Sequence, residues 1–116
     1  MISAKVKAIY TTDMDVLEEY IPYNADRFCV FVRVMAGPLQ GRGEEAFDVR
    51  VCNPKWLEAE LERDGFILCM HTVIVSEYDP DQIRRILTKL FERYSGNSWR
   101  DVALKLARIG HWEFEE

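Results

Sequence analysis

The amino-acid sequence predicts a single α+β domain, with a mainly antiparallel sheet and three main helices packed chiefly on one face. Three observations carry this prediction. The first half of the chain has three stretches in which apolar and polar residues alternate, as in half-buried strands. The second half has three capped segments with apolar residues at helical spacing. The chain has 116 residues, of which 48% are hydrophobic, so residues 1–116 suffice for one domain with its own core.

Residues 4–10 predict the first strand. Its alternation sets two groups on opposite faces, Val6, Ala8 and Tyr10 against Lys5 and Lys7. A polar connection follows, in which we expect residues 16–20 to form a short turn of helix and residues 22–26 to continue as a loop.

Residues 28–36 and 46–52 predict two further strands, joined by a long glycine-containing hairpin over residues 37–43. Strands joined in this way pair antiparallel. One face of the first of them is apolar, with Phe28, Val30, Val32 and Val34. The other face carries Cys29, Phe31, Arg33 and Met35.

A capped helix is predicted next, because Asn53 can cap it and Pro54 at its first position loses no hydrogen bond. Trp56, Leu57 and Leu61 form its expected inner face, and Gly65 is expected to end it. Residues 66–76 are unusually apolar, which predicts a central strand.

Two more helices follow in the sequence. Asp79 and Pro80 open the first, which should run for about four turns. Ser98 caps the second, which carries an apolar stripe from Trp99 to Ile109 and should end at a left-handed Gly110. We expect Trp99 to anchor the core. Beyond Gly110, aromatic and acidic residues alternate as in a strand.

Charge and composition restrict the function. The net charge is −5 and the isoelectric point about 5.1, which disfavours a nucleic-acid-binding role and leaves room for a basic protein partner. No apolar run reaches the roughly 20 residues of a membrane helix, and residues 1–7 lack a signal-peptide core, so we expect a cytoplasmic protein without a membrane segment. Cys29, Cys52 and Cys69 are expected to be buried, reduced thiols.

No catalytic, metal-binding or cofactor-binding residue is predicted. Cys69 and His71 would share a face of the predicted strand, but a nucleophilic pair needs a third orienting group and an open cleft. The cysteines and histidines lack metal-ligand spacing, and the glycines of the hairpin do not precede a helix as phosphate-binding glycines do. A small enzyme or ligand-binding domain with a pocket near Cys69 and His71 remains the alternative function.

Two surfaces are candidates for binding a partner. Four acidic residues, Asp13, Asp15, Glu18 and Glu19, crowd the first connection, where they either keep the surface hydrated or dock a cationic protein. The outward face of the sheet should carry Phe31 and Arg33 together with Cys29, Met35, Lys5, Lys7, Asp48 and Arg50. Aromatic residues, Met and Arg are typical of an interface core. The other interpretation of this face is that a second layer, such as the C-terminal tail, covers it.

With these residues laid out, the chain resembles the immunity protein 8 family of bacterial polymorphic toxin systems. The resemblance rests on short pieces that span nearly the whole chain in order: MAGP at 35–38, AFDV at 46–49, VCNPKWL at 51–57, VSEYD at 75–79, SG at 95–96, SW at 98–99 and GHWEFE at 110–115. The pieces mark caps, turns and core aromatics.

The resemblance implies an inhibitor without catalytic activity. Such a protein binds a cognate toxin domain and occludes its active site or blocks its action. The acidic balance of this chain suits a basic toxin such as a nuclease, an inference from charge alone. The resemblance carries no binding residue, so Asp13, Asp15, Glu18, Glu19, Phe31 and Arg33 remain candidates on the physical arguments above.

Overall fold

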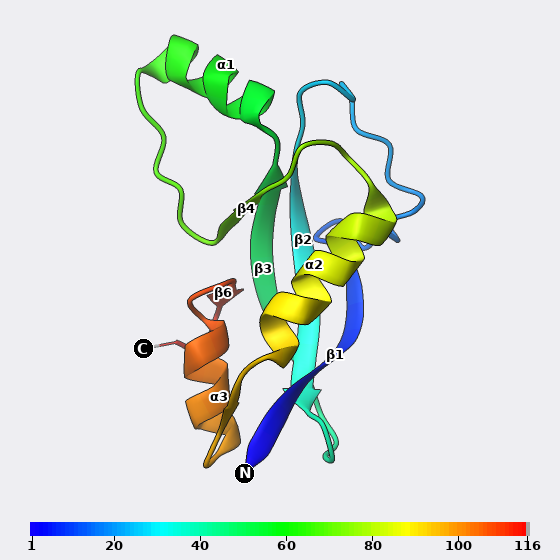
Figure 1. Ribbon diagram of the computed structural model, residues 1–116, viewed down its shortest axis with the longest axis vertical. Helices are drawn as coiled ribbons and strands as arrows, with labels where there is room; N and C mark the ends of the chain where they lie inside the picture. The colour runs from blue at the N-terminus through cyan, green and yellow to red at the C-terminus, as the bar shows by residue number, and fades with distance from the viewer. Residues whose placement is uncertain (116) are drawn as a thin grey trace.

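A curled mixed sheet forms the centre of the molecule, with the helices arranged around it (Figure 1). The structure is a computed structural model and describes residues 1–115. The strands are β1 (Ile2–Thr11), β2 (Cys29–Pro38), β3 (Glu45–Cys52), β4 (Thr72–Ile74), β5 (Ser95–Gly96) and β6 (His111–Trp112). The helices are α1 (Pro54–Asp64), α2 (Pro80–Glu92) and α3 (Trp99–Leu106).

The strands follow the order β4-β3-β2-β1-β5, and β6 pairs with the same edge of β3 as β4 does. Within residues 1–115, all the strand pairings are antiparallel except that of β3 with β4. This one pair is parallel because the chain leaves β3 through α1 and runs back along β3 only as far as Arg50, so that β4 lies beside the last three residues of β3 and runs in the same direction. The predicted α+β domain with a mainly antiparallel sheet is confirmed.

The core lies between one face of the sheet and the helices α2 and α3. Figure 1 shows α2 crossing in front of the long strands, with α3 beside it. The helices bury Ile83, Leu87, Phe91, Val102, Ala103 and Leu106. They pack on the apolar face of β2 and β3, where Phe47 and Phe91 meet edge to face with ring centroids 5.7 Å apart. This packing leaves the opposite face of the sheet free of helices α2 and α3.

A bulge in β1 changes which residues face the core. Val6 pairs with Ala36, but Ala8 pairs with Met35, so the register shifts between them. Such a shift moves every later side chain to the opposite face. Ile9 is therefore buried, and Tyr10 points to the face away from α2, so the predicted grouping of Val6, Ala8 and Tyr10 on one face is wrong.

Helix α1 has the predicted caps but buries no residue. The Asn53 side chain accepts a hydrogen bond from the Trp56 amide, and Gly65 ends the helix with φ of 81°. The helix projects beyond the end of the long strands (Figure 1). The predicted inner face is consequently wrong, and Leu61 is exposed.

The predicted central strand over residues 66–76 is also wrong. Only Thr72–Ile74 forms a strand, β4, and it lies at the edge of the sheet. His71 adopts a left-handed φ of 49°, which interrupts extended geometry just before β4. Residues 66–70 therefore form a separate segment outside the sheet, and its apolar side chains Phe66, Leu68 and Met70 are exposed.

As far as the structure describes it, the C-terminal tail extends the sheet through β6 and leaves Phe31 on the opposite face exposed. His111 and Trp112 pair with Asp48 and Phe47, and the Trp112 ring stacks on Phe47 with centroids 6.1 Å apart. A side chain at Gly110 would approach the Phe47 Cβ to 3.0 Å, so glycine is needed there for close contact. Helix α3 itself ends at Leu106, earlier than predicted, and Gly110 is not left-handed.

Candidate docking surface

The sheet face opposite α2 and α3, here called the outer face, presents a mixed aromatic and charged surface. Cross-strand partners place their side chains on the same face. Phe31 of β2 is paired with Arg50 of β3, and Arg33 is paired with both Asp48 of β3 and Tyr10 of β1. Phe31 is 51% exposed, a large value for an aromatic residue in the middle of a sheet. The predicted outward placement of Phe31 and Arg33 is therefore observed.

Arg33 and Asp48 form a bidentate ion pair on the outer face. Arg33 Nε and Nη2 donate to the two Asp48 oxygens over 2.8 Å and 3.0 Å. These hydrogen bonds to Asp48 raise the pKa of the Arg33 guanidinium, which remains charged. Arg33 therefore contributes a rigid and locally neutralised part of the surface, since its charge is already matched by a neighbour.

The acidic connection between β1 and β2 begins directly beside this outer face. The Thr12 amide donates to the Phe31 carbonyl over 3.0 Å, and the Thr11 amide donates to the Asp15 carbonyl over 2.8 Å. Val16 forms an isolated bridge with Tyr10. These contacts join the start of the connection, with exposed Asp13 and Asp15, to the edge of the surface that contains Phe31 and Arg33.

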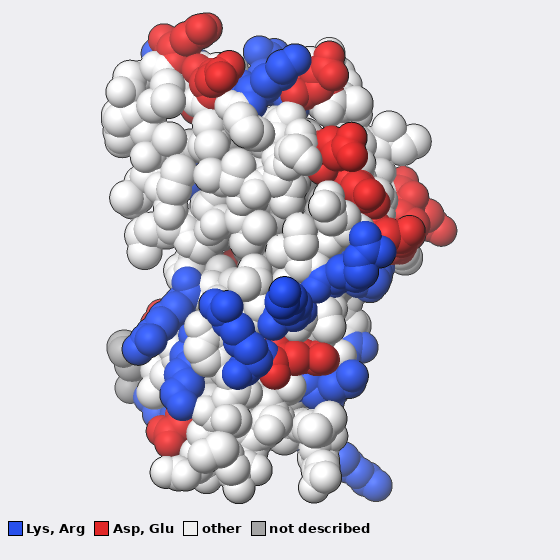
Figure 2. All heavy atoms as spheres, viewed as in Figure 1, with Lys and Arg blue, Asp and Glu red and all other residues white. Residues whose placement is uncertain are grey.

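The other two predicted acids lie further along the same connection. Glu18 and Glu19 are exposed, and Glu18 accepts hydrogen bonds from Arg84 of α2 over 2.7 Å and 3.1 Å. Figure 2 shows acidic side chains gathered over this connection and the start of α2, with basic side chains further along α2 and towards α3. The acidic set is thus a band along one side of the molecule, and one of its members is already paired.

The acidic connection also exposes large apolar side chains, which the sequence pattern did not predict. Met14, Ile21 and Tyr23 are largely or fully exposed. Leu17, by contrast, is fully buried, and the Tyr78 hydroxyl donates to its carbonyl over 2.9 Å. The connection is therefore anchored by Leu17 while it presents apolar and acidic groups outward. The sequence signal for this surface is the presence of large apolar residues among the polar residues of the connection.

A hollow of about 400 Å³ opens on the outer face next to Phe31. It is lined by Phe31, Asp48, Arg50, Leu68, Met70, His71 and His111. Arg50 forms its structural centre, with Nη2 2.7 Å from the Leu68 carbonyl, Nε 3.1 Å from Thr72 Oγ1 and its guanidinium over the Trp56 ring. The hollow thus combines the outer face of the sheet with the segment of residues 66–71.

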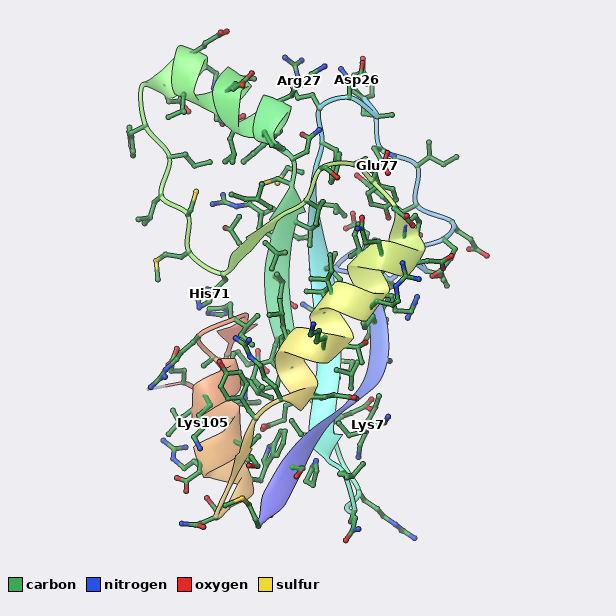
Figure 3. The ribbon with its side chains drawn as sticks, viewed as in Figure 1. Lys7, Asp26, Arg27, His71, Glu77 and Lys105 are labelled. Carbon is green, nitrogen blue, oxygen red and sulfur yellow. The ribbon has the colours of Figure 1, made fainter. Side chains whose placement is uncertain are left out.

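Cys69 and His71 do not share a face, contrary to the prediction. His71 lines the hollow, and its Nε2 lies 2.9 Å from the Ala107 carbonyl; Figure 3 shows it between β4 and the end of α3. Cys69 is exposed and does not line the hollow, so the expectation of a buried thiol is wrong for Cys69. Residues i and i+2 of a strand have their side chains on the same face. The left-handed backbone of His71 interrupts the strand, so this rule does not apply to Cys69 and His71.

Cys29 and Cys52 are more buried than Cys69, and all three are free thiols. Burial raises the pKa of Cys29 to about 11, and burial also raises the pKa of Cys52. These two thiols are therefore protonated at neutral pH. Across residues 1–115, the structure holds no group of three or more His, Cys, Asp or Glu suited to a metal ion. Over the same residues, no helix is long and apolar enough to span a membrane.

Comparison with known protein families gives a match over nearly the whole chain. The model of the protein family described as Immunity protein 8 matches residues 4–116. Neither the curated proteins nor the solved structures contain a match to this chain.

Proposed function

The chain belongs to the immunity protein 8 family, and from this premise we propose that it neutralises a cognate bacterial polymorphic toxin domain by binding it, without catalysis. The toxin would lose activity because its active site is occluded or its action is blocked. Protection against such a toxin is needed where its target lies, so the proposed place of action is the cytoplasm.

The observation that carries this proposal is the exposed outer face beside the acidic connection. A sheet face with a half-exposed aromatic residue in its centre, next to a hollow and a band of acids, has the make-up of a protein interface. Exposed apolar residues of this size are uncommon in a cluster on a monomer unless they serve an interaction. Phe31 is the proposed centre of the contact.

A basic toxin domain, such as a nuclease, is the proposed partner. The chain carries a net charge of −5, and Asp13 and Asp15 lie at the edge of the outer face. Carboxylates in this position attract a cationic partner and accelerate encounter. Glu18 and Glu19 extend the same negative field, although Glu18 is partly neutralised by Arg84.

Arg33 has a positioning role in this proposal. Its bidentate bond to Asp48 holds both side chains against the sheet beside Phe31, where they frame the contact as a pair of mutually compensated charges. Since the pair is 28–32% exposed, a partner that covers it has to remove only part of its hydration.

The test uses the toxin domain encoded beside the gene for this chain. Purified toxin is titrated with purified protein, and residual toxin activity is measured. Binding predicts a linear loss of activity that is complete near one molar equivalent, and a stable complex by size-exclusion chromatography. Complete inactivation by a small molar fraction of the protein, or a lasting chemical change in the toxin, would contradict the proposal and indicate an enzyme.

Two variants near the hollow complete this test. In the variants Cys69→Ala and His71→Ala, we expect protection against the toxin to follow complex formation. A variant that binds the toxin as the parent does should also protect as the parent does. Loss of protection with an unchanged complex would show that these residues perform chemistry, and the inhibitor proposal would then fail.

A further inference from the structure

The segment of residues 66–70, here called the edge segment, is apolar and exposed. Phe66, Leu68 and Met70 are 72%, 70% and 60% exposed. From Gly65 to Ser76 the chain carries no Asp, Glu, Lys, Arg or Pro. Such a stretch would normally be buried, yet here it runs along the outer side of the edge strand β4, as Figure 1 shows.

Two backbone carbonyls of the edge segment are hydrogen-bonded to side chains of the domain, and they define the side of the segment that faces it. The Leu68 carbonyl accepts a hydrogen bond from Arg50, and the Met70 carbonyl accepts one from Thr72 Oγ1. Both carbonyls are therefore directed to the body of the domain. Residues 66–69 run without a turn or bend before the chain bends at Met70, and in an extended run the polar groups of alternate residues point to opposite sides. Ile67 and Cys69 should then direct their amides and carbonyls outward, away from Arg50.

These outward groups have no hydrogen-bond partner in the part of the chain that the structure describes. Among residues 1–115, no hydrogen bond involves the amide or the carbonyl of Ile67 or Cys69. Natural proteins protect such edges with lysine, proline, bulges or a covering loop. The edge segment has neither lysine nor proline, so it is open to pairing with another extended chain.

We propose that a second copy of this chain pairs with the edge segment, antiparallel and symmetric about Leu68. In this register Leu68 faces Leu68 of the second copy, and Phe66 faces Met70. Ile67 faces Cys69, and these two residues exchange both of their outward hydrogen bonds, as in a hydrogen-bonded pair of an antiparallel ladder. The inference does not rest on the proposed function.

Self-complementarity is the reason for choosing a second copy over another partner. An isologous two-fold contact places each residue against its counterpart, so a charged segment would oppose like charges. The edge segment and its flanks are uncharged over twelve residues, 65–76, and every facing pair in the proposed register is apolar. The aromatic ring of Phe66 against the Met70 thioether is a favourable pair.

The first test measures the mass of the purified protein over a wide concentration range by sedimentation equilibrium. We expect a reversible dimer. Leu68→Asp should weaken association by at least about tenfold, because it sets two carboxylates against each other at the two-fold axis. Leu39→Asp is the matched control, since Leu39 is also an exposed leucine but lies on the hairpin. Thermal melts establish that both variants fold.

The second test examines the register. Facing residues of a non-hydrogen-bonded pair have Cα atoms about 4.5 Å apart, which a disulfide can bridge. In a Cys69→Ser background, Leu68→Cys should oxidise to a covalent dimer, while Leu39→Cys should not. Equal cross-linking of the two variants would overturn the register and the proposal.

Other results of the first test also overturn the proposal. They are a monomer at every concentration, or a dimer that Leu68→Asp leaves intact. If the protein is monomeric and Leu68→Asp instead weakens capture of the toxin domain, the edge segment belongs to the toxin interface. Failure of the dimer leaves the toxin titration unaffected, so the two proposals fail separately.

Discussion

Arg50 of β3 donates a hydrogen bond of 2.7 Å to the carbonyl of Leu68, and this contact ties the edge segment to the sheet. The same guanidinium also binds Thr72 Oγ1 and lies over the Trp56 ring, with 5.4 Å between its carbon and the ring centroid. One side chain thereby joins the sheet to α1, β4 and the edge segment. The hollow beside Phe31 depends on Arg50 for its shape.

Arg50→Ala should release the edge segment without unfolding the domain. The charge-assisted hydrogen bonds and the contact with Trp56 together predict a loss of about 1–3 kcal/mol in the free energy of unfolding, measured by urea denaturation. Hydrogen exchange should accelerate in β4 and the edge segment and stay slow in β2. Arg100→Ala, on the exposed side of α3, is the control. Unchanged exchange in β4 would show that Arg50 is not the tie.

Trp99 packs against the core but is only partly buried. Its indole Nε1 donates to Glu45 over 2.7 Å, which ties α3 to the first residue of β3. Trp99→Ala should therefore cost about 3 kcal/mol, the low end for a large aromatic residue. Trp99→Phe, which keeps an aromatic ring but loses the hydrogen bond, should cost about 1 kcal/mol. Equal losses for the two variants, measured by urea denaturation, would assign the whole effect to the hydrogen bond.

Alkaline pH should destabilise the protein through Tyr78. Burial raises the pKa of Tyr78 to about 12 from its ordinary value of 10.0, and the hydroxyl donates to the Leu17 carbonyl. The folded state thus holds the proton more tightly than the unfolded state does. This contribution to stability is complete below pH 10 and disappears as the pH rises to about 12.

Tyr78→Phe is the variant that isolates this effect. It should be less stable than the parent at pH 7 by about 1 kcal/mol, because the hydrogen bond to Leu17 is lost. The difference should shrink between pH 10 and 12, since phenylalanine has no proton to lose. Denaturation midpoints over that range measure it. A constant difference would show that Tyr78 does not titrate differently in the two states.

Local signals in the sequence predicted the fold class and much of the core. The alternation in residues 28–36 and 46–52 correctly identified β2, β3 and their outer face, since each strand has one face against α2. The helix caps at Asn53, Asp79 and Ser98 were also correct. Helix caps and strand alternation depend on residues that are close in the sequence. They can therefore be recognised without knowledge of tertiary contacts.

The candidate surface was only partly predictable, because it depends on contacts between distant segments. Phe31 and Arg33 followed from alternation alone. Arg50 and Leu68, 18 residues apart, are joined by a side-chain hydrogen bond that no local pattern encodes. The apolar run of residues 66–70 predicted a buried strand, but the segment is exposed. An apolar composition favours burial without determining which segments the fold covers. The bulge that turns Tyr10 to the outer face likewise has no signature in an alternating stretch.

The last prediction separates the acidic connection from the sheet face in toxin binding. The double substitution Asp13→Asn and Asp15→Asn should slow association with the toxin roughly tenfold at low ionic strength, because exposed carboxylates act at long range. The dissociation rate should change little. Salt should weaken association of the parent more than that of the variant. Stopped-flow mixing with the toxin domain measures both rates.

Phe31→Ala should have the opposite kinetic effect. Removing an aromatic residue from the centre of a desolvated contact costs about 2 kcal/mol, which corresponds to roughly 30-fold faster dissociation with association nearly unchanged. Glu58→Gln with Glu62→Gln on α1 is the matched control for charge, since it removes two exposed carboxylates far from Phe31 along the chain. If this control slows association as much as the change at Asp13 and Asp15, net charge alone steers the toxin. If Phe31→Ala leaves dissociation unchanged, the toxin binds elsewhere on the molecule.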